Sequence, residues 1–144
     1  MSTVRDMIRK KGGEIFSISP DDSVYDALVQ MAKRNTGALM VVSGGRMEGI
    51  VSERDCVRKV DLEGRTPRET RVSEIMTTKV VSVEAGQPLE DCMALMIENN
   101  IRHLPVYDGR ELLGLVSVRD VLREVVEVQK SMISQLQEYI TGGG

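Results

Sequence analysis

Two seven-residue stretches combine a hydroxyl, a guanidinium and a carboxylate at fixed spacing. They read Gly49-Ile50-Val51-Ser52-Glu53-Arg54-Asp55 and Gly114-Leu115-Val116-Ser117-Val118-Arg119-Asp120, and the second begins 65 residues after the first. In each stretch a glycine and two apolar residues precede the polar groups. If the apolar residues form a strand that runs into a helix, the three polar groups share one strand-to-helix corner.

Such a corner has two interpretations. A serine followed three residues later by an acid is a capping-box pattern, which stabilises a helix by ~1 kcal/mol and needs no ligand. The same corner also suits a ligand, because a helix N-terminus and an arginine fork attract phosphate oxygens. An ionised aspartate accepts hydrogen bonds from a vicinal diol. Phosphate and diol binding together indicate a nucleotide, and the residues alone leave both interpretations open.

The elements that position the corners follow from apolar spacing and turn residues. We expect, in order, a helix over residues 3–10, a strand over 14–18, a helix over 24–35, strands over 37–42 and 47–52, and a helix over 53–60. Thr3 and Ser23 are the expected helix caps, and glycines at 44 and 45 predict a hairpin between the last two strands. The repeated unit is therefore strand, helix, strand, strand, helix.

This unit occurs twice. Residues 17–60 align without a gap to residues 82–125, and 14 of the 44 positions are identical. Chance agreement would be about one position in fifteen, so the internal repeat is real. We divide the chain into a first unit with an N-terminal helix (1–62), a linker (63–71), a second unit (72–126) and a C-terminal helical extension (127–144).

The last segment predicts one long helix over residues 121–140. Its apolar stripe consists of Leu122, Val125, Val126, Met132, Ile133, Leu136 and Ile140, and glycines at 142–144 end it. The part beyond residue 126 has no counterpart in the first copy. It either packs back on its own unit or meets a second chain, and an exposed stripe of this length would be an association surface.

Composition excludes several kinds of protein. The 144 residues carry a net charge of -3, which argues against a broad nucleic-acid or membrane surface. The arginines at 65, 68 and 71 are expected in a solvated loop. Cys56 and Cys92 lack metal-ligand spacing and are expected to pack in the core. With no signal peptide and no long apolar segment, we expect a cytoplasmic protein.

The repeated unit resembles a known family. The pattern that ends in Gly-apolar-Val-Ser-x-Arg-Asp, present twice, is similar to a tandem pair of CBS domains, called a Bateman module. Ile75-Met76-Thr77 and Ile101-Arg102-His103-Leu104-Pro105-Val106 also resemble characteristic stretches of that family. The resemblance covers residues 4–125. It implies an α+β fold of two pseudo-twofold units packed through their sheets, with two clefts between them, followed here by the C-terminal helix.

Site residues are carried over from this resemblance by position. Such clefts bind AMP, ADP, ATP, NAD-type dinucleotides or S-adenosylmethionine, and Asp55 and Asp120 would hold the ribose hydroxyls. The residues expected to face phosphate are Ser52, Arg54, Ser117, Arg119, Arg102 and Lys79. The residues expected near the base are Phe16 and Ala38 in one cleft, and Val81, His103 and Pro105 in the other.

The two copies differ where selectivity would arise. Arg102 aligns with a glycine at 37 and Lys79 with a glutamate at 14, so the second copy has more positive charge. We therefore expect unequal clefts, with tighter phosphate binding in the second. His103 aligns with Ala38, outside the shared frame; a lone histidine beside a strand is more often structural, and a base or phosphate contact stays open.

The sequence thus predicts a stand-alone, non-enzymatic regulatory module that senses an adenine nucleotide. No set of residues supplies a nucleophile with its base, a metal cluster or paired carboxylates. The expected partners are a second copy in a homodimer and an unidentified regulated protein, with no nucleic acid and no membrane. The alternative is a ligand-free structural or interaction module that acts through its C-terminal helix.

Overall fold

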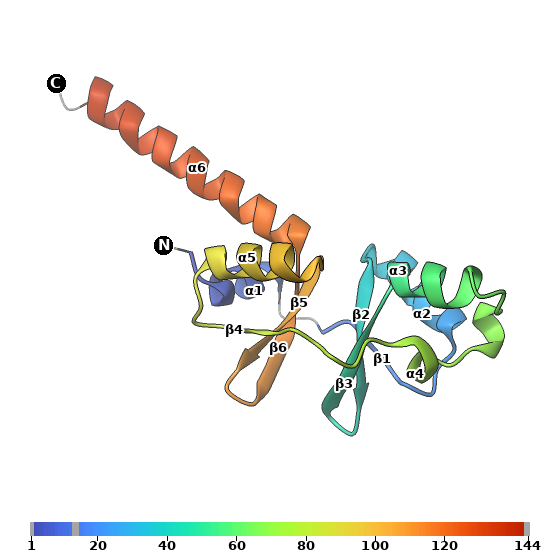
Figure 1. Ribbon diagram of the computed structural model, residues 1–144. Coiled ribbons are helices and arrows are strands. Elements are labelled where there is room, and N and C mark those ends of the chain that lie inside the picture. The colour runs from blue at the N-terminus through green and yellow to red at the C-terminus, as the bar shows by residue number, and fades with distance from the viewer. Residues whose placement is uncertain (1, 13–14, 143–144) are drawn as a thin grey trace. The chain divides into compact units, whose positions relative to one another are not determined.

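The computed structural model describes residues 2–12 and 15–142, which fold as two compact units. The central unit comprises residues 15–81, and the terminal unit comprises residues 2–12 together with 82–142. The central unit contains β1 (Ser17–Ile18), α2 (Val24–Arg34), β2 (Ala38–Ser43), β3 (Arg46–Ser52), α3 (Glu53–Cys56), η1 (Val57–Asp61), η2 (Pro67–Glu69) and α4 (Val72–Ile75). The terminal unit contains α1 (Val4–Lys11), β4 (Val83–Glu84), α5 (Leu89–Asn99), β5 (His103–Asp108), β6 (Glu111–Ser117) and α6 (Val118–Thr141) (Figure 1).

The two units contain equivalent three-stranded sheets. Their orders are β1-β2-β3 and β4-β5-β6, with a parallel first pair and an antiparallel hairpin in each. In the hairpins, Ala38 pairs with Ser52 and His103 pairs with Ser117, and the same bulge follows three residues further along in both. The repeat predicted without a gap is therefore confirmed in backbone register, as is the α+β fold.

A short leading helix precedes each copy of the repeat, α1 before the first and α4 before the second. Each leading helix packs in the unit that contains the sheet of the other copy. The N-terminal helix, assigned by sequence to the first unit, packs in the terminal unit, where Val4 N–H donates to the Gln87 carbonyl and Met7 is buried. Helix α4 begins the second copy in sequence but lies in the central unit, where Val72 and Ile75 join the apolar core. Each leading helix therefore buries its apolar face against the sheet of the other copy.

Several predicted boundaries shift. The strand expected over 14–18 forms only at Ser17–Ile18, and residue 14 lies outside the described residues. Its end at Ile18 is as predicted, because a turn follows in which Ser19 N–H donates to Asp22. The helix expected over 53–60 is a four-residue α-helix that continues as a π-helix through Asp61. The long C-terminal helix is confirmed and begins at Val118.

The segment expected as a linker belongs to the central unit. Thr70 is buried, and its carbonyl accepts a hydrogen bond from Val24 N–H at 2.8 Å. Arg68 stacks on the Tyr25 ring at 3.9 Å, and Arg65 pairs with a glutamate. The three arginines are exposed, as expected of a solvated loop, and Arg65 and Arg68 also make specific contacts within this unit.

The C-terminal helix leaves its own unit after its second turn. Its only buried residues are Val121 and Glu124, and every described residue from 126 to 142 is exposed. Figure 1 shows this part of α6 extending away from α1 and α5. Of the two alternatives for the apolar stripe, packing back on its own unit is therefore wrong beyond residue 125.

Candidate functional site

The two strand-to-helix corners form as the spacing predicted. We call Ser52, Arg54 and Asp55 the central corner, at the junction of β3 and α3. Ser52 Oγ accepts from Asp55 N–H at 3.1 Å, and Asp55 Oδ2 accepts from both the N–H and the hydroxyl of Ser52 at 3.0 Å. The capping-box interpretation is therefore confirmed, even though aspartate is shorter than the usual glutamate.

The terminal corner, Ser117, Arg119 and Asp120, repeats this geometry between β6 and α6. Asp120 Oδ2 accepts from the Ser117 N–H at 2.8 Å and from its hydroxyl at 3.0 Å. Ser117 Oγ accepts from Asp120 N–H at 3.2 Å. In both corners the arginine is exposed, while the serine and the aspartate are half-buried.

Hydrogen bonds within the chain already occupy two of the first three backbone N–H groups of the helix at each corner. Glu53 N–H donates to the Gly37 carbonyl at 3.0 Å, and Val118 N–H donates to the Arg102 carbonyl at 2.9 Å. The third N–H of each helix is bound by the serine hydroxyl. Available N–H groups were expected to attract phosphate to these corners. An anion at either corner would therefore meet fewer available N–H groups than expected, together with the side-chain cations.

A lysine pairs with each corner aspartate, and sequence reasoning missed both lysines. At the central corner, Lys59 Nζ lies 3.1 Å from Asp55 Oδ1 and donates to the Ile75 carbonyl at 2.9 Å. Thr77 Oγ1 also donates to Asp55 Oδ1, at 3.4 Å. The spacing of four residues between Asp55 and Lys59 was the available signal.

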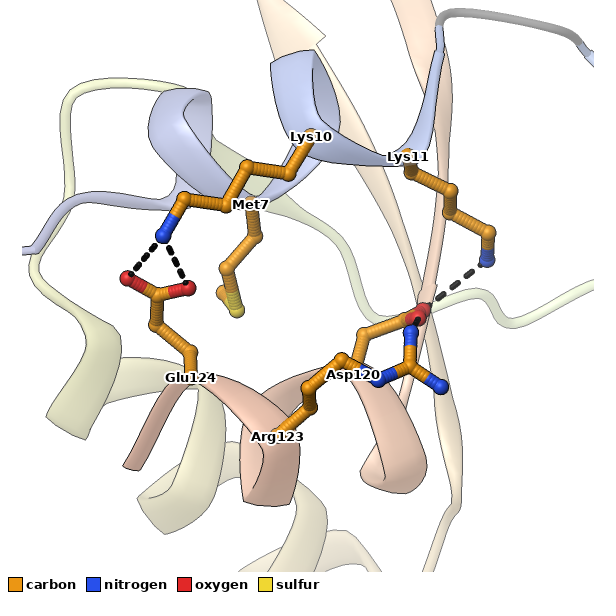
Figure 2. A pocket seen from close by; sticks show the side chains of 6 residues that line it. All are labelled: Met7, Lys10, Lys11, Asp120, Arg123 and Glu124. Atoms are coloured by element: carbon orange, nitrogen blue, oxygen red, sulfur yellow. Dashed lines mark hydrogen bonds and ion pairs between the residues drawn. The ribbon is translucent and has the colours of Figure 1, made fainter. Parts of the chain in front are cut away.

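At the terminal corner the lysine comes from α1. Lys11 Nζ donates to Asp120 Oδ2 at 2.9 Å (Figure 2). It also donates to the Leu115 carbonyl at 2.8 Å. Lys11 and Asp120 are 109 positions apart, so no local pattern linked them. Burial alone would raise the pKa of Asp120, but hydrogen bonds from Lys11 and Ser117 outweigh it and hold that pKa below its ordinary value.

A small cavity of about 100 Å³ borders Asp120 within the terminal unit. Figure 2 shows its lining, which comes from α1 and α6 and consists of Met7, Lys10, Lys11, Asp120, Arg123 and Glu124. Lys10 Nζ contacts both Glu124 oxygens, at 3.0 and 2.9 Å. Pockets for drug-sized ligands occupy about 300–1,000 Å³, so this cavity has room for a small group or water but not for a nucleoside.

Two residues distinguish the terminal corner from the central one. The Arg102 carbonyl occupies the place of the Gly37 carbonyl, so an arginine side chain stands where the central corner has none. His103 pairs with Ser117 as Ala38 pairs with Ser52. Burial above all, and then the charge of Lys11, lowers the pKa of His103 to about 4. Asp120 acts in the opposite direction, and Arg102 adds the smallest lowering effect. His103 is therefore neutral at pH 7.

The other predicted site residues are divided between the units. Phe16 is half-buried before β1, with the Arg34 guanidinium 4.7 Å from its ring centre. Lys79, exposed, and Val81, half-buried, belong to the central unit, whereas Pro105 is buried in β5 of the terminal unit. The residues expected to serve the second corner thus come from both units.

The cysteines and possible metal ligands add no further site. Cys56 and Cys92 are buried, as expected, and burial raises the pKa of each thiol to about 11. Within residues 2–12 and 15–142, no group of three or more His, Cys, Asp or Glu side chains could hold a metal ion. No helix in the same ranges is long and apolar enough to cross a membrane.

Comparison with known proteins identifies the family. The sequence model of the CBS domain matches residues 4–62 and 72–127. A putative signal-transduction protein with CBS domains from Burkholderia ambifaria is 46% identical, with a TM-score of 0.84 over 88% of this chain and 95% of that one. The chain therefore belongs to the CBS-domain family and carries a tandem pair of these domains, which is a regulatory module.

Two further proteins are similar over most of the chain. The mitochondrial CBS domain-containing protein CBSX3 of Arabidopsis thaliana is 38% identical over 99% of this chain and 73% of its own length. The CBS domain pair of protein MJ0100, solved in complex with 5′-methylthioadenosine and S-adenosyl-L-methionine, has a TM-score of 0.77 at 23% identity. The match covers 88% of this chain and 98% of that one. At this identity the likeness to protein MJ0100 concerns the fold alone.

Proposed function

We propose that this chain is a non-enzymatic sensor that binds an adenine nucleotide or another adenosyl ligand at its two corners. The observation that carries the proposal is the pair of aspartates, Asp55 and Asp120, held identically in both units by capping boxes. Holding a carboxylate in place before binding lowers the entropy that a ribose diol must overcome. The adenosyl ligands of protein MJ0100, which has the same fold, support this ligand class.

The remaining acceptor capacity fits a diol. Asp120 Oδ1 lies 3.9 Å from Arg123 Nη1, too far for a hydrogen bond, so this oxygen can accept from a ribose hydroxyl. At the central corner, Asp55 Oδ1 already receives Lys59 and the long contact from Thr77. A ribose there shares this oxygen with the lysine or displaces it, and a displaced ammonium is available to a nearby phosphate.

The corners are proposed to bind unequally. The terminal corner adds Arg102 to the arginine that both corners have, and Lys11 and Arg123 lie beside Asp120. The central corner has Arg54 and Lys59, with Gly37 in the place of Arg102. A more anionic ligand such as ATP should therefore prefer the terminal corner. Ser52, Ser117, Arg119 and Lys79 complete the proposed phosphate ligands, and Phe16, Ala38, Val81, His103 and Pro105 the proposed base contacts.

A thermal-shift comparison with AMP, ATP, NAD and S-adenosylmethionine tests the proposal. A ligand at about 100 times its Kd stabilises the folded state by about 2.7 kcal/mol, which raises the Tm by several degrees. The Asp55→Ala/Asp120→Ala double variant should lose this shift. Asp6→Ala is the matched control, because Thr3 and Asp6 form the same capping box in α1 outside the corners.

Each outcome is informative. Loss of the shift in the double variant, with the shift retained in Asp6→Ala, supports ligand binding at the corners. Absence of a shift with all four ligands in the wild-type protein contradicts it, as does an unchanged shift in the double variant. The proposed difference in affinity between the two corners needs a separate test. Calorimetry should resolve two ATP affinities, and Arg102→Ala should weaken the tighter one. Two identical sites would contradict the proposed difference.

The second candidate function is a ligand-free interaction module. It is favoured by corners whose carboxylates already accept from serine and pair with lysine within the chain, and by the exposed apolar face of α6. Absence of nucleotide binding together with retained self-association would favour this candidate. A homodimer is proposed for both candidates. The sensor would act on a regulated protein, and the interaction module would act on a partner protein through its C-terminal helix.

The cytoplasm is the compartment we propose for this function. The two cysteines, Cys56 and Cys92, are free and buried, which suits a reducing compartment. Cell fractionation with an antibody against the chain tests this location. Recovery in an organelle, as the name of the mitochondrial Arabidopsis relative would suggest, would contradict it.

A further inference from the structure

The exposed part of α6 has an apolar face without a partner in its own unit. Five large apolar side chains on it are 47–76% exposed, namely Leu122, Val126, Ile133, Leu136 and Ile140. Isolated helices of about 12–15 residues are only marginally stable in water, and most helix stability comes from burying an apolar face. Residues 126–141 continue the helix that Val121 and Glu124 anchor in the unit, and covering their apolar face would stabilise this part.

The spacing of these residues is that of a coiled coil. Leu122, Val126, Gln129, Ile133, Leu136 and Ile140 follow one another at alternating intervals of four and three. This is the a/d spacing of a heptad repeat, in which Val126, Ile133 and Ile140 occupy a positions and Leu122, Gln129 and Leu136 occupy d positions. β-Branched residues at a with leucine at d favour two parallel strands over higher assemblies.

Gln129 distinguishes between a parallel and an antiparallel pair of helices as the cover for this face. It is the one polar residue in the seam, and it is exposed in the single chain. In a parallel pair of identical helices in register, Gln129 meets the same residue of the partner, and the two amides can donate to and accept from each other. In an antiparallel pair centred on residue 131, Gln129 would face Ile133 and lose its hydrogen bonds, which costs about 1–3 kcal/mol.

The charged and polar residues agree with this arrangement. Glu127, Ser131, Gln135 and Glu138 lie at b, c and f positions, on the face opposite the seam. The e position next to Gln129 holds Lys130, whose methylene stem can cover the seam while its ammonium stays in water. No like charges face each other across a parallel seam. The stripe is therefore complementary to a second copy of itself.

We propose that α6 pairs with α6 of a second copy of this chain as a parallel, in-register, two-stranded coiled coil over residues 122–140. This assigns an interface to the homodimer of the proposed function and does not depend on the ligand. Val125, Met132 and Tyr139 flank the seam at g positions and widen its apolar contact.

Cysteine cross-linking of the full chain tests orientation and register. Ile140→Cys should form an interchain disulfide under mild oxidation, because residue 140 faces its own copy in the parallel pair. Gln135→Cys, on the outer face, is the matched control and should not cross-link. The native Cys56 and Cys92 are buried and form no background. Cross-linking only in a Leu122→Cys/Ile140→Cys double variant would mean an antiparallel pair and would overturn the proposal.

Sedimentation equilibrium tests whether this helix is the interface. Ile133→Glu places two carboxylates in the seam and should weaken dimerisation by about 100-fold or more. Ser131→Glu adds the same charge on the outer face and should leave the dimer unchanged. Because residues 126–141 make no core of their own unit, both variants should keep the folded units intact. A monomeric wild-type chain, or an Ile133→Glu variant as dimeric as the wild type, would overturn the helix pairing. The second outcome leaves a homodimer through another surface possible.

Discussion

His103, the only histidine in the chain, reports on the terminal corner through its pKa. Burial is the first cause that lowers this pKa to about 4 from the ordinary 6.5, and the charges of Lys11 and Arg102 add to it. In the unfolded chain the same imidazole is protonated near pH 6.5. The folded state therefore resists a proton that the unfolded state accepts, which links stability to pH.

The sign and size of this linkage follow from the two pKa values. Because the folded pKa is the lower one, the contribution of His103 to stability is complete above pH 6.5. It is lost as the pH falls through the window from 6.5 to about 4. Between pH 6.5 and about pH 4.5 the window spans about two pH units. At about 1.36 kcal/mol per unit, the loss is about 3 kcal/mol.

Urea unfolding at about pH 7.5 and pH 4.5, compared between wild type and His103→Gln, measures this contribution. The wild type should lose about 3 kcal/mol more than the variant, because the carboxylates titrate alike in both and cancel. An NMR titration of the imidazole should place the wild-type pKa near 4. Lys11→Met should raise it to a value between 4 and 6.5, since burial remains. A wild-type histidine that titrates near 6.5, or equal losses in both proteins, would refute the reasoning.

Three further predictions concern glycine, cysteine and a surface ion pair. Gly49→Ala should destabilise the central unit by about 2 kcal/mol or more in urea unfolding, because the new Cβ would lie 2.6 Å from a backbone carbonyl oxygen. Gly86→Ala, with open space around it, should change stability by less than about 0.5 kcal/mol, and equal effects would contradict the close approach. Cys56 and Cys92, whose pKa values are raised to about 11, should react with a thiol reagent at pH 8 only after urea is added; rapid reaction of the native protein would contradict their burial. Arg65→Ala should leave the urea midpoint of unfolding nearly unchanged, because the side chains of its ion pair are 37% and 42% exposed, and a clear loss of stability would indicate a further contact.

Local chemistry in the sequence predicted the corners well. A serine and an aspartate three positions apart form a capping box through backbone geometry alone, so Ser52 and Asp55 needed no tertiary information. The repeat then fixed the hairpin register, because equivalent apolar residues must face equivalent cores. The prediction that Ala38 and His103 hold equivalent positions followed from this register and is confirmed.

Tertiary contacts account for what the sequence did not predict. Lys11 reaches Asp120 because the N-terminal helix packs in the terminal unit, and an apolar helix face carries no signal for which of two similar sheets it will cover. The π-helix after Cys56 has the composition of an ordinary helix, so its wider turn was not visible in the spacing. The roles of Arg54, Arg119 and the base-proximal residues remain predictions, since they depend on a bound ligand.

Helix α6 joins a candidate ligand corner to a candidate interface without a break. Its 24 residues begin at the Ser117 cap and end at Thr141, so at 1.5 Å per residue it is a rod about 36 Å long. A tilt of about 10° at the Ser117 end would move the far end by about 6 Å, roughly one helical turn. A small movement around Asp120 is therefore amplified into a larger displacement at the far end of α6. Two such helices paired over residues 122–140 would keep their far ends together, so the same tilt would change the spacing of the two terminal units at the Ser117 ends.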